Sequence, residues 1–229
     1  MIGYHSGLIC SYKTCLKDGT RKNYEGSSKG MEPHMAIELH TNNDLFEEKQ
    51  VYGARLIMDD DSTTLAGLQK VSPNSVIKWS DKIHSSKNFK KSLYALKLSK
   101  PLIVHFSSNF YAAIEENKGD VEGLSSALKA IVRHAFGEHN YCLFHEEKEN
   151  YHYKNLPNNT PLQNEQLKIS LNDLISKYTN NAEKLAPAAS TQANESFNNT
   201  MSSFCPRNKH YSNSESLDYR MAAAVCQKK

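Results

Sequence analysis

Hydrophobic residues along the chain recur at two kinds of spacing, which predict a mixture of strands and helices. Short apolar runs rich in β-forming residues predict strands at residues 51–58 and 76–79 and a hairpin at residues 2–16. A strand at 51–58 followed at once by a helix is typical of α/β folds. Apolar residues three or four positions apart predict helices near residues 32–48, 62–71, 80–97, 102–117, 121–135 and 162–184, from residue 192 onward, and at 214–226.

The strand predicted at residues 51–58 ends in a cluster of acids. Its apolar residues are followed directly by Asp59, Asp60 and Asp61. Three neighbouring carboxylates repel one another, and a bound cation relieves that repulsion. The same acids, followed by Ser62, also fit the solvated N-terminal cap of a helix. The pattern by itself therefore leaves a metal site and a helix cap as alternatives.

The middle of the chain, from about residue 99 to residue 186, contains helical patterns and no convincing strand. The patterns are interrupted at Gly119, at Gly137 and in a proline-containing loop at residues 157–161. We therefore expect an all-α insertion at residues 99–186. Residues 1–98 and 187–229 are expected to form the first part and the C-terminal helices of one α/β domain.

The composition restricts the class of protein. A chain of 229 residues with 38% hydrophobic content can form one large domain, or one domain with an insertion. An odd number of scattered cysteines argues against a disulfide framework, and neither a secretory signal nor a membrane-length apolar run is present, which predicts an intracellular protein. A net charge of +3 permits contact with nucleic acid without demonstrating it.

The helix predicted after the second strand is basic. Its apolar residues, such as Phe89 and Leu93, are spaced to face a core, while Lys87, Lys90 and Lys91 lie on faces that could meet phosphates. The charges alone fit a solvated amphipathic helix equally well.

A second group of candidate ligands lies in the helical middle of the chain. Cys142 and His145 are separated by two residues and have the side-chain types that structural zinc sites use. A complete set of four ligands is not visible in the sequence. Structural zinc and ordinary packing or surface histidines therefore stay open as alternatives.

An acid at the end of a strand and a second acid on a later helix, separated by a helical insertion, is the plan of an RNase H-like nuclease core. The chain resembles the Mutator-like transposases of animal genomes, whose catalytic domain has this fold and a DDE triad. The resemblance rests on the Asp-Asp-Asp-Ser box at 59–62, on Asp81-x-x-His84, and on the Asn-Glu-Ser-Phe-Asn box at 194–198. A Cys-Pro turn at residues 205–206 follows where the family has a similar turn.

The resemblance implies a role for each matched residue. Asp59 would be the second catalytic acid, with Asp61 as the alternative, and Glu195 would be the third. These carboxylates would hold Mg²⁺ or Mn²⁺, and two such ions activate a nucleophile and stabilise a leaving oxygen in phosphoryl transfer. Asp81 and His84 would position the core or the DNA.

In the family, the first catalytic Asp lies on a strand upstream of a hairpin like residues 2–16. The resemblance therefore implies a chain truncated at its N-terminus, and Asp18, in the following loop, is not expected to replace the missing acid. We expect such a chain to be inactive on its own. The alternative hypothesis is a non-catalytic, host-adopted or decayed transposase derivative that binds DNA or protein.

The resemblance also implies the partners and the location of the protein. The protein would bind transposon ends and target DNA in the nucleus, and it could form homo-oligomers. Neither a membrane nor a small-molecule substrate would be a partner. An ordinary cytosolic α/β domain is disfavoured, because it would give the Asp-x-x-His and Asn-Glu-Ser-Phe-Asn boxes no common purpose.

Overall fold

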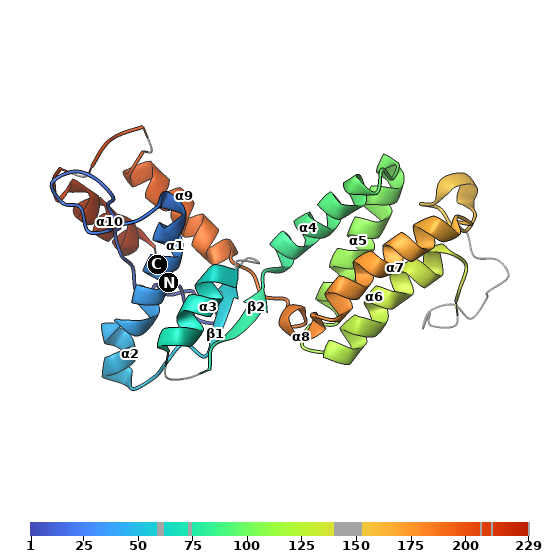
Figure 1. Cartoon of the computed structure of the whole chain (residues 1–229), viewed down its shortest axis with the longest axis horizontal. Coiled ribbons are helices and arrows are strands. Elements are labelled where there is room, and N and C mark those ends of the chain that lie inside the picture. Colours follow the sequence, from blue (N-terminus) through green and yellow to red (C-terminus); the bar gives the residue numbers. More distant parts are fainter. Residues whose placement is uncertain (59–61, 73–74, 140–152, 207, 212, 229) are drawn as a thin grey trace. The chain divides into compact units, whose positions relative to one another are not determined.

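The computed structural model describes residues 1–58, 62–72, 75–139, 153–206, 208–211 and 213–228. Within them, the chain consists mainly of helices together with one pair of strands (Figure 1). The helices and strands are α1 (Ser28–Thr41), α2 (Asp44–Lys49), β1 (Arg55–Met58), α3 (Ser62–Val71), β2 (Ile77–Ser80), α4 (Lys82–Ala95), α5 (Lys100–Glu116), α6 (Val121–Ala135), α7 (Glu165–Thr179), α8 (Ala182–Leu185), α9 (Gln192–Phe204) and α10 (Ser216–Gln227), with a 3₁₀ turn at Pro157–Asn159.

The chain divides into two compact units. The first, which we call the split unit, combines Met1–Lys78 with Thr191–Lys229. The second, the helical unit, is the continuous segment Trp79–Ser190. The helical unit thus interrupts the split unit in sequence.

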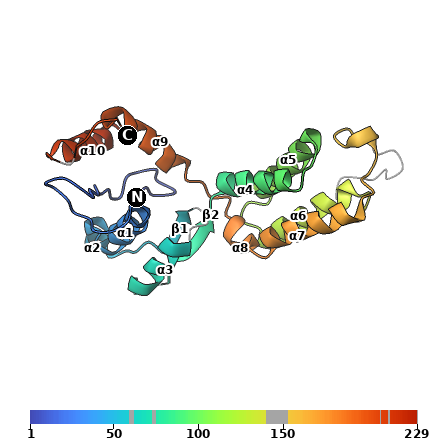
Figure 2. The same cartoon turned by 45° about the horizontal axis from the view of Figure 1, so that its top comes forward.

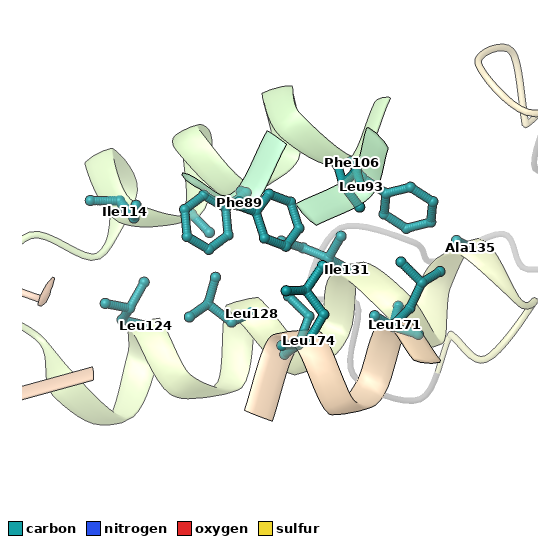
Figure 3. Close-up of a cluster of buried hydrophobic side chains, with 14 of the residues drawn as sticks. Phe89, Leu93, Phe106, Ile114, Leu124, Leu128, Ile131, Ala135, Leu171 and Leu174 are labelled. Atoms are coloured by element: carbon teal, nitrogen blue, oxygen red, sulfur yellow. The ribbon is translucent and has the colours of Figure 1, made fainter. Parts of the chain in front are cut away.

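The helical unit is built around one apolar core. Helices α4 to α8 contribute to it, and α6 and α7 run side by side (Figures 1 and 2). Figure 3 shows side chains of α4 and α5 meeting those of α6 and α7 in this core. At its centre the rings of Phe89 and Phe110 stack with centroids 4.2 Å apart, and Tyr178 meets both rings edge-on. The cluster therefore joins the consecutive helices α4 and α5 to α7, which lies much later in the sequence.

Local sequence signals explain where these helices begin and end. Asp120 caps α6 by accepting a hydrogen bond from the Gly123 amide, and Asn164 caps α7 in the same way. Pro101 lies in the first turn of α5, where its missing N–H is harmless. Gly137 has a φ of 86° just after α6, a conformation that glycine adopts without strain.

The two ends of the helical unit lie next to each other. The Lys82 amide, at the start of α4, donates a hydrogen bond of 2.9 Å to the carbonyl of Ala189. A segment whose ends meet can be inserted into another domain without separating the flanking parts of that domain.

The split unit contains strand β1, the start of β2 and two helix pairs. Strands β1 and β2 form a parallel two-stranded sheet. Helix α3 packs on α1, where a side chain added at Gly67 would come within 2.6 Å of Ile37 Cδ1, so the glycine permits the close approach. Helices α9 and α10 pack on each other.

Most predicted elements are confirmed, with differences at local breaks. The helix predicted at 32–48 is divided into α1 and α2, because the Asn43 side chain caps a new helix. The helix predicted at 162–184 is divided into α7 and α8 at residues 180–181. The hairpin predicted at 2–16 contains one antiparallel bridge, between Ile2 and Ile9, and no longer strand.

The division between units also differs from the predicted boundary after residue 98. The structure places α4 in the helical unit, because Phe89 and Leu93 of this helix are completely buried in its core. The RNase H-like architecture predicted for the remaining parts of the chain stays a prediction.

Candidate active site and nucleic-acid surface

The acidic box lies between two confirmed elements. Strand β1 ends at Met58 and helix α3 begins at Ser62. Asp59 and Asp61, the predicted second catalytic acid and its alternative, lie outside the described residues. The structure thus confirms the strand before the acidic box and the helix after it, and the position of these carboxylates stays a prediction.

Glu195, the predicted third acid, lies in the first turn of α9 and is exposed. A carboxylate in this position is stabilised by the positive end of the helix dipole. Phe197, on the same helix, is buried, and the Lys228 ammonium lies 5.7 Å from its ring centre. Lys228 Nζ also donates a hydrogen bond of 2.9 Å to the Ala193 carbonyl, so the end of α10 fixes the first turn of α9.

A metal site needs several ligands, and a single exposed carboxylate does not provide one. No group of three His, Cys, Asp or Glu side chains suited to a metal ion occurs in the part of the chain that the structure describes. A metal site that includes Glu195 would therefore need ligands from outside the described residues, and the 59–61 box is their predicted source.

Asp81 is nearly inaccessible to solvent, with 2% of its surface exposed, and it caps α4. One oxygen, Oδ1, accepts hydrogen bonds from the amides of Ile83 at 2.7 Å and His84 at 2.8 Å. The Nδ1 atom of His84 lies 3.5 Å from the same oxygen. In this structure the Asp-x-x-His box is thus a helix cap at the entrance to the helical unit.

The three lysines proposed to contact DNA lie on α4 beyond this cap. Lys87, Lys90 and Lys91 are exposed, and no ion pair joins any of them to an acid of the described residues. Lys82, one turn earlier, differs because it pairs with Glu115 at 2.5 Å. That hydrogen bond lowers the pKa of the Glu115 carboxyl.

The predicted zinc ligands Cys142 and His145 lie outside the described residues. Just before them in sequence, the Nε2 atom of His139 is hydrogen-bonded to the Tyr153 hydroxyl at 2.6 Å. The ring of His139 also meets His134 edge-on, with centroids 5.0 Å apart. These contacts stabilise the end of α6 through aromatic packing, and a zinc site stays a prediction.

The structure also contains a pocket that the sequence did not indicate. It has a volume of about 890 Å³ and lies between the first turns of α5 and residues 154–157. His105, Asn109, Lys100 and Lys154 are among its lining residues. The Asn109 amide lies 3.2 Å from His105 Nε2, and burial lowers the pKa of this imidazole. The only sequence signal was the His105/Asn109 spacing of one helical turn.

A comparison with known families decides the broad identity. A family model described as Mutator-like transposase matches residues 10–148, which is more than half of the chain. The chain belongs to the Mutator-like transposase family. The match includes Asp59, Asp61, Asp81 and His84 and ends before Glu195. Searches of curated proteins and of solved structures found no match to this chain.

A helix that crosses a bilayer needs about 20 predominantly apolar residues. None of the helices in the described ranges is both long enough and apolar enough to do so.

Proposed function

We propose that this member of the family derives from the catalytic region of a DNA transposase, with an RNase H-like core interrupted by the helical unit. The observation that carries the proposal is the family match over residues 10–148, which includes the acidic box after β1. The continuous helical unit with adjoining ends supports the idea of an insertion.

In this proposal the site is formed by acids from both segments of the split unit. Asp59 is the second acid of the triad, with Asp61 as the alternative, and Glu195 is the third. Carboxylates of this kind suit Mg²⁺ or Mn²⁺, which in such enzymes activates a nucleophile for phosphoryl transfer and stabilises the leaving oxygen. Asp81 acts at a distance from this chemistry, by holding the start of α4.

No residue of the sequence is assigned as the first acid of the triad. We therefore expect the 229-residue chain alone to bind a divalent ion and not to cleave DNA efficiently, because two-metal catalysis needs the full carboxylate set. Robust Mg²⁺- or Mn²⁺-dependent nicking of DNA with the terminal repeats of the parent element, abolished by Asp59→Ala, would contradict this expectation.

The assignment of the two acids can be tested without catalysis. Isothermal titration with Mn²⁺ should show binding by the full chain that is weakened about tenfold or more by Asp59→Ala and by Glu195→Ala, since each removes a charged ligand. Glu165→Ala is a matched control, because Glu165 is also an exposed acid in the first turn of a helix, α7. Equal Mn²⁺ affinity in all four proteins would overturn the assignment.

A second candidate function is non-catalytic DNA binding by a transposase-derived protein. The specific observation in its favour is the group of exposed lysines on α4, which lies in a different unit from Glu195 and does not depend on the acids. DNA binding without Mn²⁺ binding would favour this candidate over the first.

A further inference from the structure

The start of the helical unit is unusually rich in positive charge. Between residues 82 and 114 the sequence contains no Asp or Glu. The next acid along the chain is Glu115, which pairs with Lys82. Helix α4, the following turn and most of α5 thus form one basic segment. Its lysines are Lys82, Lys87, Lys90, Lys91, Lys97 and Lys100.

Helix α4 has its buried apolar residues on one face and exposed lysines on another. Phe89 and Leu93 are completely buried in the core of the helical unit. Lys87, Lys90 and Lys91 are exposed and follow the spacing of neighbours on one helix face, in which residues three or four apart lie next to each other. Tyr94 continues this face one turn later and is 57% exposed. We call these four residues the α4 face.

The lysines of the α4 face are available for a partner. No acid of the described residues forms an ion pair with Lys87, Lys90 or Lys91. Three like charges on neighbouring turns repel one another, and the nearby sequence offers no carboxylate that would relieve the repulsion. An external polyanion would relieve it.

The basic character continues past the end of α4. Lys97 lies in the turn between α4 and α5, and Lys100 is the first residue of α5; both are exposed. Lys100 also lines the 890 Å³ pocket together with Lys154, which is exposed as well. The pocket therefore adds positive charge from a second segment at the start of α5.

The size of the α4 face fits a nucleic-acid backbone. From Lys87 to Tyr94 the helix advances about 10 Å, at about 1.5 Å per residue. Successive phosphates of one DNA strand are about 3.4 Å apart along the duplex axis, so the face spans about three of them. Lysine recognises phosphate as a point charge, which suits binding that is independent of sequence.

We propose that the α4 face, extended by Lys97 and Lys100, binds the phosphate backbone of duplex DNA. This inference rests on the proposed function, in which DNA is the partner. It adds the identity of the surface that binds the DNA. Lys87, Lys90 and Lys91 neutralise phosphates and release counterions, which provides the affinity. Tyr94 adds an exposed ring at the end of the face.

The test measures binding of the full chain to a fluorescent 20-base-pair duplex between about 50 and 200 mM salt in EDTA. The triple variant Lys87→Gln/Lys90→Gln/Lys91→Gln should lose about tenfold or more in affinity, and the slope of log K against log salt should become shallower by up to about three units. Glutamine keeps the helix propensity of these exposed positions, and circular dichroism checks the fold.

The matched control changes three other exposed lysines of the helical unit. Lys129→Gln/Lys177→Gln/Lys184→Gln removes the same charge from α6, α7 and α8, where Asp173 and Glu183 lie close in sequence to the changed positions. This variant should bind DNA within about threefold of the unchanged chain and keep its salt slope, because it loses no phosphate contact.

Three results would overturn the proposal. The first is an α4-face variant with unchanged affinity and slope, and the second is an equal loss in the control variant. The third is stronger competition by poly-glutamate than by unlabelled duplex, which would indicate an acidic protein as the partner. Because EDTA removes divalent ions, none of these binding measurements depends on a metal held by Asp59 and Glu195. Failure of the unchanged chain to bind duplex DNA at all would also overturn this proposal. The proposed function would then be judged separately by the Mn²⁺ titration of the Asp59 and Glu195 variants.

Discussion

At the scale of single residues, Asp81 illustrates how a motif residue can be explained by local structure. It lies within the residues that match the family model, and the structure shows a buried carboxylate that accepts two backbone hydrogen bonds at the start of α4. A buried acceptor that satisfies two amide donors stabilises the helix that carries the α4 face. Asp81 therefore influences that face through the position of the helix.

Replacement of Asp81 should reveal this role. Asp81→Ala removes the acceptor of two amide hydrogen bonds and should lower the free energy of unfolding by about 2 kcal/mol, at the upper end for an N-cap. Asp81→Asn keeps an N-cap oxygen and should cost about 0.5 kcal/mol or less. Urea denaturation followed by circular dichroism measures both. Equal destabilisation by the two variants would show that the negative charge, rather than the cap, is what matters.

At the scale of elements, the helices of the helical unit each present one apolar face to a shared core. Phe110 of α5 stacks on Phe89 of α4 and meets Tyr178 of α7, so one side chain connects three helices. Val104, on the same helix, is 52% exposed. Two apolar residues of α5 thus have very different structural roles, which their chemical type does not reveal.

The difference can be measured by truncating each side chain. Phe110→Ala should destabilise the protein by about 3–5 kcal/mol, because it leaves a cavity among three helices. Val104→Ala should change the free energy of unfolding by about 0.5 kcal/mol or less, as expected for an exposed position. Thermal denaturation of both variants provides the comparison, and a similar loss in the two would contradict the described core.

At the scale of the whole molecule, the chain is organised as a continuous helical unit and a split unit. All the residues of the main hydrophobic core lie between Phe89 and Ala188, within the helical unit. Its ends are joined by the hydrogen bond from the Lys82 amide to the Ala189 carbonyl. A segment with its own core and adjoining ends satisfies the requirements for independent folding.

We therefore predict that a fragment of residues 79–190 folds alone. It should show helical circular dichroism and one cooperative thermal transition. A fragment of residues 99–186, which follows the boundary expected from sequence, lacks Phe89 and Leu93 and should lose cooperative unfolding, because each missing core residue is worth about 2–5 kcal/mol. Cooperative unfolding of the shorter fragment would show that α4 is dispensable to the core.

Part of the candidate site was accessible from sequence, because it depends on short motifs. The acidic box, the Asp-x-x-His box and the lysines of α4 are each contained in a few neighbouring residues. The pocket beside His105 was not accessible, because residues about fifty positions apart form its walls. The spacing of residues along the sequence does not reveal which distant segments meet to form a pocket.

The sequence by itself determined where most helices lie, and the match over residues 10–148 that places the chain among the Mutator-like transposases. Both depend on local information: helical hydrogen bonds join residues four apart, and α3, α5 and α6 have clear apolar periodicity and breaks. Only the tertiary structure decided that α4 belongs to the helical unit and that Asp81 is buried beneath its first turn. Burial depends on what other segments cover, and the side chains that enclose Phe89 come from helices up to ninety residues away.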